Sequence, residues 1–403
     1  MSRIAFFCIP AAGHTHPTLE VVRALTQAGH QVRYYSFERF RARIEEAGAQ
    51  FVACDAYDVE TKLTPADGAR IAKDVAFATE VLVETTLAMD DQLLDELRAF
   101  APQAVVADSM AMWGKLLARK LNVPFISSTT TFAFNQHSSR VMKQGMGELL
   151  RLLFKLPKIN RQLARLRAKG YTVRNILDVI ANDNATNTIV YTSTTFQPCA
   201  DTFSDCYHFV GPSVREKPAL PRQSTRKRVY VSLGTVNNDM PAFFRRCIEA
   251  LSGTYELIIS IGEQVDPASL GELPPYTTVA QQVDQMAVLA DCDAFLTHCG
   301  MNSVSEALWC GVPLVLWPQT PEQSGVANRT EELGAGLRLM DASAQGIRAA
   351  VETVLREDTY RQAVSRIRES FRTAGGPQEA ARVIAQLAAE DVASHREDDS
   401  GEE

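Results

Sequence analysis

A turn near residue 300 combines the residue types that hold an anion. It follows an apolar strand predicted at 292–297 and opens a helix predicted to end at Cys310, before Gly311. The free N–H groups of a helix N-terminus and the helix dipole favour a bound anion at that place. Within the turn, Gly300 lets a phosphate approach the backbone, and His298 adds a ring N–H. The turn therefore predicts a phosphate site at the edge of a sheet.

Polar side chains on the following helix and beyond the next strand extend this site. Glu306 lies about one turn into the helix on the face of Ser303, where its carboxylate could accept hydrogen bonds from the hydroxyl pair of a ribose. Glu322 and Gln323 follow the strand predicted at 314–317, at the edge where open α/β sheets bind ligands. The Ser303-to-Glu306 spacing has an alternative interpretation as a capping box, in which Glu306 only ties down the helix start. Together, these residues suit a nucleotide-sugar diphosphate.

A second constellation follows the first predicted strand. The turn there carries His14 between Gly13 and Pro17, and a histidine can act as a general base because it titrates near neutrality. The turn is not GxGxxG, which disfavours a dinucleotide-phosphate cradle. A histidine base needs a carboxylate to orient its other ring nitrogen, and Asp108, at the end of another predicted strand, is the natural partner. The alternative role of Asp108 is to cap the next helix.

The ordered residues from 297 to 323, THCGMNSVSEALWCGVPLVLWPQTPEQ, strongly resemble the donor-binding motif of the UDP-dependent glycosyltransferases of family 1, which have the GT-B fold. The bacterial macrolide and flavonoid branch is the most similar, because its motif also ends in Glu-Gln. Gly-His-x-x-Pro at 13–17 and Ser-Leu-Gly-Thr at 232–235 are similar to further family motifs. The resemblance implies that His14 is the catalytic base with Asp108 as its partner. It implies donor contacts from Ser232, Gly234, Thr235, Val283, Gln285, His298, Gly300, Asn302, Ser303, Glu306, Glu322 and Gln323.

The resemblance also implies an inverting displacement on a UDP-hexose, with glucose as the expected sugar. A hydroxyl of a hydrophobic natural product, such as a macrolide, a flavonoid or another phenolic, loses its proton to His14 and attacks the anomeric carbon. His298 and the helix N-terminus stabilise the charge that grows on the departing diphosphate. No acidic DxD triad is apparent near this site, so neither a metal nor another cofactor is expected. Two other functions stay open: a UDP-sugar epimerase of the same fold and a non-catalytic nucleotide-sugar-binding protein.

The chain departs from the family where the uracil ring is expected to bind. Relatives carry an aromatic residue, then Val or Cys, Pro and Gln, whereas this chain has Gln282-Val283-Asp284-Gln285. The backbone of Val283 can still contact the base edge, but the aromatic residue that would stack on the base is missing. We therefore expect thymidine diphosphate sugars to be tolerated better than in relatives. UDP should remain the best carrier, because Glu306 favours a 2′-hydroxyl.

Strand and helix patterns alternate along most of the chain, which predicts parallel sheets with right-handed crossovers. We expect an α/β protein with two facing Rossmann-like doubly wound domains (GT-B) and a C-terminal helix that returns to the first domain. Pro17 is expected in the first turn of a helix at 17–28. The expected parts are an acceptor-binding domain at 1–210, a linker at 211–227, a nucleotide-sugar-binding domain at 228–375, the return helix at 376–389 and an acidic, disordered tail at 390–403.

Composition and charge exclude several classes of protein. Hydrophobic residues make up 46% and charged residues 22% of the chain, as in ordinary globular proteins. No apolar run has the length of a membrane span, and the first residues do not resemble a secretory signal, so no stable membrane insertion is expected. The eight cysteines show no metal-binding spacing and are typical of reduced thiols in the cytoplasm. Most of the net charge of −7 lies in the tail, and no basic stripe with aromatic residues indicates nucleic-acid binding.

One segment carries unusual charge. Residues 140–170 interleave Lys and Arg with Leu, Phe and Ile, and Pro157 interrupts the pattern. We expect a solvated pair of helices on the acceptor side. The alternative is an amphipathic helix at a membrane surface.

Overall fold

The chain forms two compact units, each built on a parallel sheet. The computed structural model describes residues 1–54, 70, 74–141, 147–180, 182–234 and 238–399. Unit 1 contains Met1–Tyr191, Cys199–Ser213 and Gly375–Glu403, and unit 2 contains Thr192–Pro198 and Val214–Ala374. This division differs from the expected one at residues 192–198, which lie inside the stretch assigned to the first domain but belong to unit 2.

The sheet of unit 1 has seven strands in the order β3-β2-β1-β4-β5-β6-β7, and all its neighbours are parallel. Side chains alternate along β1, so that Ile4 and Phe6 enter one apolar cluster while Ala5 and Phe7 enter another. Apolar residues on both faces are typical of a sheet that helices cover on both sides. The strands are β1 (Arg3–Phe7), β2 (Gln31–Ser36), β3 (Gln50–Ala53), β4 (Ala104–Asp108), β5 (Phe125–Thr129), β6 (Thr188–Val190) and β7 (Tyr207–Phe209).

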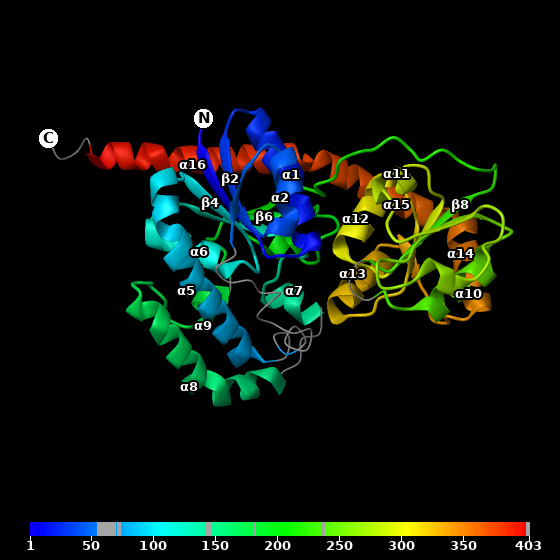
Figure 1. Ribbon diagram of the computed structural model, residues 1–403, viewed down its shortest axis with the longest axis horizontal. Coiled ribbons are helices and arrows are strands. Elements are labelled where there is room, and N and C mark those ends of the chain that lie inside the picture. The colour runs from blue at the N-terminus through cyan, green and yellow to red at the C-terminus, as the bar shows by residue number, and fades with distance from the viewer. Residues whose placement is uncertain (55–69, 71–73, 142–146, 181, 235–237, 400–403) are drawn as a thin grey trace. The chain divides into compact units, whose positions relative to one another are not determined.

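Helices pack on both faces of this sheet. Apolar residues of α1, α2 and α16 share one cluster with the sheet, and those of α5 and α6 share the other. Figure 1 shows α16, in red, running beside α1, so the C-terminal helix returns to the first unit as expected. The helices are α1 (Ala12–Gln27), α2 (Arg41–Glu46), α5 (Val75–Phe100), α6 (Met112–Leu121), α7 (Gln136–Val141), α8 (Gly147–Ala168), α9 (Ile176–Ile180) and α16 (Gly376–Asp399), with 3₁₀ turns η1 (Glu38–Phe40) and η3 (Ala200–Thr202).

Two prolines lie inside helices instead of limiting them. The prediction that a helix starts at Pro17 is wrong, because α1 begins at Ala12 and contains Pro17. Pro17 has no N–H to donate to the turn before it, and so near the start of the helix this loss disturbs little of the hydrogen-bond ladder. Pro157 likewise lies within α8, so 147–168 is one helix and not a helical pair.

Several basic residues in and just after α8 are paired with acidic residues along α5. Lys158 contacts Glu80 at 2.8 Å, and Lys169, just after α8, contacts Asp91 at 2.7 Å. Apolar residues of α8, including Leu163, pack into a cluster with α5. Figure 1 shows the two helices side by side. Intramolecular pairing thus accounts for much of the charge in this segment.

The last helix is longer than expected. The segment 390–403 was predicted to be disordered, yet α16 continues from Gly376 to Asp399. The segment carries no Pro or Gly before Gly401, so no helix breaker stops the continuation of α16. Among the helices of the described ranges, none combines the length and the apolar character that crossing a bilayer requires.

The sheet of unit 2 has six strands in the order β10-β9-β8-β11-β12-β13, again all parallel. Val229 and Val231 of β8 pack on one face with α10 and α14, while Tyr230 stacks on Phe295 on the other face with ring centroids 4.6 Å apart. The elements are β8 (Arg228–Ser232), α10 (Pro241–Leu251), β9 (Glu256–Ser260), η4 (Pro267–Leu270), β10 (Thr277–Ala280), α11 (Gln285–Leu289), β11 (Ala294–Thr297), α12 (Met301–Cys310), β12 (Leu314–Leu316), α13 (Pro321–Glu332), β13 (Gly336–Arg338), α14 (Ala344–Arg356) and α15 (Asp358–Thr373).

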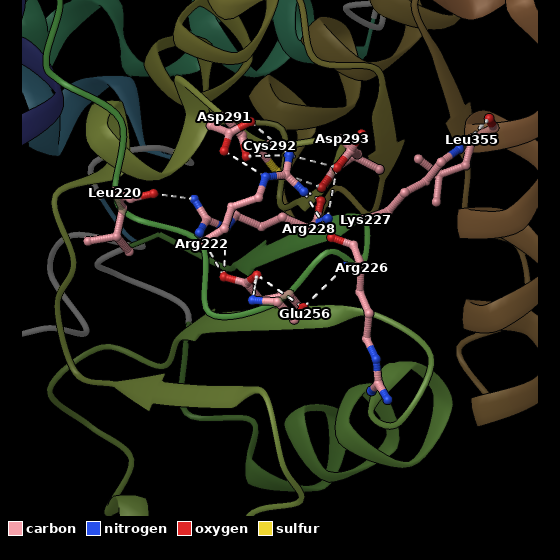
Figure 2. A network of polar contacts seen from close by, with 12 residues as sticks. Leu220, Arg222, Arg226, Lys227, Arg228, Glu256, Asp291, Cys292, Asp293 and Leu355 are labelled. Atoms are coloured by element: carbon pink, nitrogen blue, oxygen red, sulfur yellow. Dashed lines mark hydrogen bonds and ion pairs between the residues drawn. The ribbon is translucent and has the colours of Figure 1, made fainter.

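A network of ion pairs fixes the stretch before β8 at the amino-terminal edge of this sheet (Figure 2). Arg228 is fully buried and contacts Glu256 at 2.7 Å. The same guanidinium donates to the carbonyl of Leu220 at 2.8 Å. Arg222 makes a bidentate pair with Asp291, at 2.6 and 2.7 Å. The segment predicted as a linker is therefore anchored to unit 2.

The short segment 192–198 is also anchored to unit 2. Arg329 of α13 donates to the carbonyl of Phe196 at 3.0 Å, and the ring of Phe196 meets that of Phe371 edge-on at 5.7 Å. Ser193 and Ser370 share a hydrogen bond. These contacts explain why the segment belongs to unit 2 although the chain returns to unit 1 at Cys199.

Candidate functional site

The structure joins the predicted base and its carboxylate at the carboxyl-terminal edge of the unit 1 sheet. His14 lies in the first turn of α1, and Asp108 ends β4, the strand that pairs with β1. His14 Nδ1 is 2.7 Å from Asp108 Oδ2, and the two side chains are 24% and 0% exposed. Because an ionised carboxylate only accepts, the proton between them belongs to Nδ1. The other nitrogen, Nε2, is then the basic one, as a general base requires.

The two carboxylate oxygens of Asp108 have different hydrogen-bond partners. While Oδ2 accepts from His14, Oδ1 accepts from the N–H of Met110 at 2.9 Å and closes the turn after β4. The residue that caps α6 is Ala111, so Asp108 orders the turn and not the helix. Thr130, just after β5, adds a hydroxyl 3.2 Å from His14 Nδ1, a contact that sequence reasoning missed.

Exposed apolar side chains lie on the segments around this pair. Met110, two residues after Asp108, is 50% exposed, and Phe134, in the segment after β5, is 43% exposed. β5 pairs with β4 so that Ser128 lies opposite Asp108, which brings both segments to the same sheet edge. Large exposed apolar groups at a sheet edge suit an apolar ligand.

In unit 2, the predicted anion turn has the expected backbone. Gly300 is the N-cap of α12, and no side-chain hydrogen bond caps the helix there. The first-turn N–H groups of α12, at Met301 and Asn302, therefore lie at an uncapped helix N-terminus. Gly311 ends the helix with φ of 84°, a conformation that favours glycine, as predicted.

Two glycines make room for the imidazole of His298. A Cβ on either Gly234 or Gly300 would come within 2.6 Å of His298 Nε2. Burial lowers the pKa of His298 to about 4, so the ring is neutral near pH 7 and carries one N–H. Its buried Nδ1 has no hydrogen-bond partner in the described parts of the chain. A neutral imidazole with unused hydrogen-bonding capacity beside a helix N-terminus is suited to a diphosphate.

Glu306 does not tie down the helix start, so the capping-box interpretation is wrong. Ser303 lies inside α12, and Glu306 Oε2 instead accepts from Gln285 Nε2 at 2.6 Å. Gln285 Nε2 also lies 3.4 Å from Ser303 Oγ, and Gln285 Oε1 accepts from Tyr230 at 3.2 Å. Burial raises the pKa of Glu306 to about 7, against a lowering by the Gln285 N–H. Three predicted donor residues, Gln285, Ser303 and Glu306, thus form one cluster, and Tyr230 was missed.

The loop after β12, where Glu322 and Gln323 were predicted to contact the donor, is held by hydrogen bonds of its own side chains. Thr320 caps α13, and Gln323 Oε1 accepts from the backbone N–H of Gln319 at 2.8 Å. One end of the Gln323 amide therefore holds the loop, while Glu322 lies in the first turn of α13. Both polar atoms of the Gln319 side-chain amide are buried and have no partner among the residues described. Gln319 lies within the motif, but nothing in its residue type indicated this state.

The loop after β8 is ordered by its own polar groups. Ser232 Oγ accepts from the N–H of Gly234 at 3.3 Å, and Asn238 Nδ2 donates to the carbonyl of Gly234 at 2.8 Å. Asn238 is buried, and its Oδ1 lacks a partner within the described ranges. Thr235 lies outside the described residues. Ser232 thus shapes the loop that carries Gly234 over His298.

The segment expected to contact the base is largely exposed. Asp284 caps α11 by accepting from the N–H of Ala287 at 3.2 Å, so its role here is structural. Gln282 Nε2 donates to Glu263 at 2.8 Å. Val283 is partly exposed between them. In the described part of the chain, no three His, Cys, Asp or Glu side chains gather as metal ligands would.

The chain is similar to known proteins over most of its length. The family model for the C-terminal domain of erythromycin biosynthesis protein CIII-like proteins matches residues 249–387. The chain is 32% identical to the NDP-glycosyltransferase YjiC of Bacillus subtilis (strain 168) over 388 residues, which cover 94% of this chain and 96% of the relative. It is also 32% identical to the demethyllactenocin mycarosyltransferase of Streptomyces fradiae, over 95% of this chain and 86% of that protein.

A solved structure extends the comparison to three dimensions. The calicheamicin glycosyltransferase CalG4 superposes with a TM-score of 0.81 and 29% identity, over 96% of this chain and 98% of that one. The superposition includes both parallel-sheet units of this chain, as expected for the predicted fold class. Together with the two full-length relatives, it establishes that the chain is a glycosyltransferase with a nucleotide-sugar donor. The chain therefore belongs to the family 1 glycosyltransferases with the GT-B fold, in the branch that contains the macrolide glycosyltransferases.

Proposed function

We propose that the protein is an inverting O-glycosyltransferase that moves a hexose, in the first instance glucose, from UDP to a hydroxyl of a hydrophobic natural product. A macrolide, a flavonoid or another phenolic fits this description. The observation that carries the proposal is the 2.7 Å contact between His14 Nδ1 and Asp108 Oδ2, because it leaves Nε2 as a base. A non-catalytic binding protein has no use for such an oriented base, and an epimerase, which needs no acceptor, is distinguished by the assay below.

The first step of the proposed reaction is proton transfer. The acceptor O–H donates to His14 Nε2, and the acceptor oxygen attacks the anomeric carbon as its proton leaves. Asp108 stabilises the imidazolium that forms and stays ionised. Attack from the face opposite the leaving diphosphate inverts the anomeric configuration. The exposed Met110 and Phe134 side chains support an apolar acceptor.

The second requirement is a site for the leaving group. As the bond to the sugar breaks, negative charge collects on the diphosphate. The N–H groups at the start of α12 and the neutral ring of His298 supply hydrogen bonds and a positive dipole end for that charge. We propose that these groups suffice without a bound metal ion. Adding a chelator should then leave transfer unchanged.

The nucleotide is proposed to be UDP because of Glu306. Its carboxylate accepts one hydrogen bond from Gln285 through Oε2, and Oε1 accepts none within the described part of the chain. A ribose with both hydroxyls can donate to that carboxylate, whereas a deoxyribose offers only one of them. The eight free cysteines support the proposed cytoplasmic location, where thiols stay reduced.

Product analysis tests the proposal directly. The enzyme is incubated with UDP-glucose and a panel of macrolides, flavonoids and simple phenols, with UDP release measured in parallel without any acceptor. We expect release that depends on the acceptor, and a product whose anomeric coupling in NMR shows the β configuration. A panel that includes deoxyhexose donors tests the sugar. Conversion of UDP-glucose to another UDP-sugar without acceptor would contradict the proposal and favour an epimerase.

A further inference from the structure

A buried tyrosine is connected to the proposed ribose carboxylate by two successive hydrogen bonds. The hydroxyl of Tyr230, on β8, lies 3.2 Å from Gln285 Oε1, and Gln285 Nε2 lies 2.6 Å from Glu306 Oε2. Tyr230 is 1% exposed, so its hydroxyl cannot itself meet a nucleotide in solution. It nevertheless lies at the inner end of the cluster that contains Ser303 and Glu306.

The chemistry of the three groups sets the direction of these bonds. An ionised carboxylate only accepts, so Glu306 requires the NH₂ end of the Gln285 amide. The carbonyl end then faces Tyr230, whose hydroxyl donates to it. If the amide were reversed, its carbonyl oxygen would face the Glu306 carboxylate, and the two acceptors would repel each other. The Tyr230 hydroxyl therefore favours the one amide orientation that supports the carboxylate.

Tyr230 is itself held rigidly. Its ring stacks on Phe295 with centroids 4.6 Å apart, and β8 and β11 pair so that these two residues are opposite each other. Gln285 begins α11, which Asp284 caps. A side chain fixed to a central strand gives its hydrogen-bond partners a fixed position, and that order need not be created when a ligand binds.

We propose that Tyr230 is a positioning residue for donor binding, which orients Glu306 toward the ribose hydroxyls through Gln285. This inference rests on the proposed function, since it assumes that Glu306 contacts the ribose. Tyr230 lies on β8, outside the donor motif, and would be a further determinant of nucleotide affinity. It also predicts an effect on the acidity of Glu306 that a merely structural tyrosine would not have.

The acidity effect follows from the neighbours of Glu306. Burial raises its pKa to about 7, the Gln285 N–H lowers it, and the charge of Asp284 raises it. The other titratable neighbours are Tyr230 itself and Cys310, one turn along α12. Arg368 of α15 faces Cys310. Without the Tyr230 hydroxyl, the Gln285 amide is less well oriented, and the ionised form of Glu306 loses support.

The test is Tyr230→Phe, which removes one oxygen and keeps the ring that stacks on Phe295. Tyr255→Phe is the matched control, because it removes a hydroxyl from another buried tyrosine of unit 2, in the cluster with α10 and α14. Gln285→Leu removes the middle of the connection. Calorimetric titration with UDP-glucose, repeated across a pH series, gives the affinity and the pH midpoint of binding for each variant.

We expect Tyr230→Phe to weaken UDP-glucose binding by about threefold to tenfold above neutrality, the usual worth of one hydrogen bond. Its pH midpoint should rise by about half a unit or more. Gln285→Leu should do both more strongly, and Tyr255→Phe should match the wild type. If Tyr230→Phe keeps the wild-type affinity and midpoint, or only lowers the melting temperature, the proposal is overturned.

A readout without ligand separates this proposal from the proposed function. In protein labelled with ¹³C at glutamate carboxyls, the Glu306 signal is assigned by its loss in Glu306→Gln, and its titration is followed by NMR. An upward shift of that titration in Tyr230→Phe supports the connection whichever nucleotide the enzyme uses. If the wild type fails to bind UDP-glucose while this shift is present, the donor assignment fails and the connection stands. An unchanged titration contradicts the connection alone.

Discussion

The two edges of the unit 2 sheet use polar side chains in opposite ways. At the amino-terminal edge, Arg222 and Arg228 are paired with Asp291 and Glu256 and with backbone carbonyls (Figure 2). At the carboxyl-terminal edge, His298 Nδ1, Asn238 Oδ1 and the Gln319 amide are buried without partners in the described parts of the chain. The two arginines at the first edge have their partners within the protein, whereas the three residues at the second edge keep unused hydrogen-bonding capacity.

This difference separates residues that stabilise the fold from residues that we propose to bind the donor. A buried polar group without a partner costs about 1–3 kcal/mol, and folded proteins seldom keep several of them together without a function. The apolar cores on both faces of the sheet offset that cost. Substitutions at the amino-terminal edge should therefore lower stability, and substitutions at the carboxyl-terminal edges of the two sheets should lower activity or affinity.

The largest expected effect concerns the carboxyl-terminal edge in unit 1. His14→Ala should reduce kcat/KM for transfer by about 10²–10⁴-fold, because it removes the general base. UDP affinity and the melting temperature should change little. Asp108→Ala should be no worse, and the double variant should resemble His14→Ala, since Asp108 acts through His14. Steady-state kinetics with a hydroxylated acceptor measures this, and near-normal turnover in His14→Ala would rule out the dyad.

At the amino-terminal edge of unit 2, the expected loss is in stability. Arg228→Met should destabilise the fold by about 3–5 kcal/mol, because the buried Glu256 loses its partner. Urea unfolding followed by tryptophan fluorescence measures this, since Trp309 and Trp317 both lie in unit 2. Adding Glu256→Leu should recover much of the loss. If kcat/KM of the folded variant fell without a change in stability, the amino-terminal edge would not serve stability alone, and the difference between the two edges would be contradicted.

A smaller loss is expected in nucleotide affinity. His298→Ala and Glu306→Ala should each weaken UDP binding by about 1.5–3 kcal/mol, the worth of a charge-assisted hydrogen bond. The first loses a phosphate contact and the second a ribose contact. Isothermal titration of UDP measures both effects. If Glu306→Ala bound UDP normally but melted at a lower temperature, Glu306 would belong with the stabilising residues.

A smaller effect again is expected on the selectivity for the nucleotide base. Because residue 282 is Gln and donates to Glu263, no aromatic ring at that position stacks on the base. Stacking is worth roughly 1–3 kcal/mol, so Gln282→Trp should tighten UDP binding by up to about that amount. The wild type should prefer UDP-glucose to TDP-glucose by less than about a thousandfold in kcat/KM, roughly 4 kcal/mol. A larger preference would show that the ribose contact and the Val283 backbone supply the selectivity.

The smallest effect is a pH dependence with opposite signs for binding and stability. The pKa of Glu306 is raised to about 7 from 4.5, so between these values the folded state holds a proton that the unfolded state has lost. The contribution of Glu306 to stability therefore falls as pH rises through this window. UDP-glucose affinity should instead rise as pH increases through about 7, because ionised Glu306 accepts better. Glu306→Gln should flatten both trends, and a binding curve that stays equally steep in that variant would contradict the assignment.

Local patterns were sufficient for much of the fold. The two sheets could be predicted because strands such as β1, β4 and β11 are short apolar runs between helical patterns, whereas the short strands β6, β7 and β13 were missed. The helix end at Gly311 could be predicted because glycine there adopts positive φ. Helix starts were harder: α1 begins at Ala12, before Pro17, because packing of the helix on the sheet outweighs one missing hydrogen bond. The helical part of the tail was missed because its charge suggested disorder.

The sequence by itself determined the family, the doubly wound sheets and the candidate residues His14, Asp108, His298 and Glu306, because these depend on motifs and periodicity along the chain. Only the tertiary structure decided how those residues are used. His14 and Asp108 were expected to pair, but the geometry of a contact between positions 94 residues apart and the added contact from Thr130 leave no local pattern in the sequence. The same holds for the Tyr230–Gln285–Glu306 connection, for the orphan amide of Gln319 and for Gln323 holding its own loop. Partners, burial and pKa values are properties of the surroundings that folding assembles, and residue type alone does not contain them.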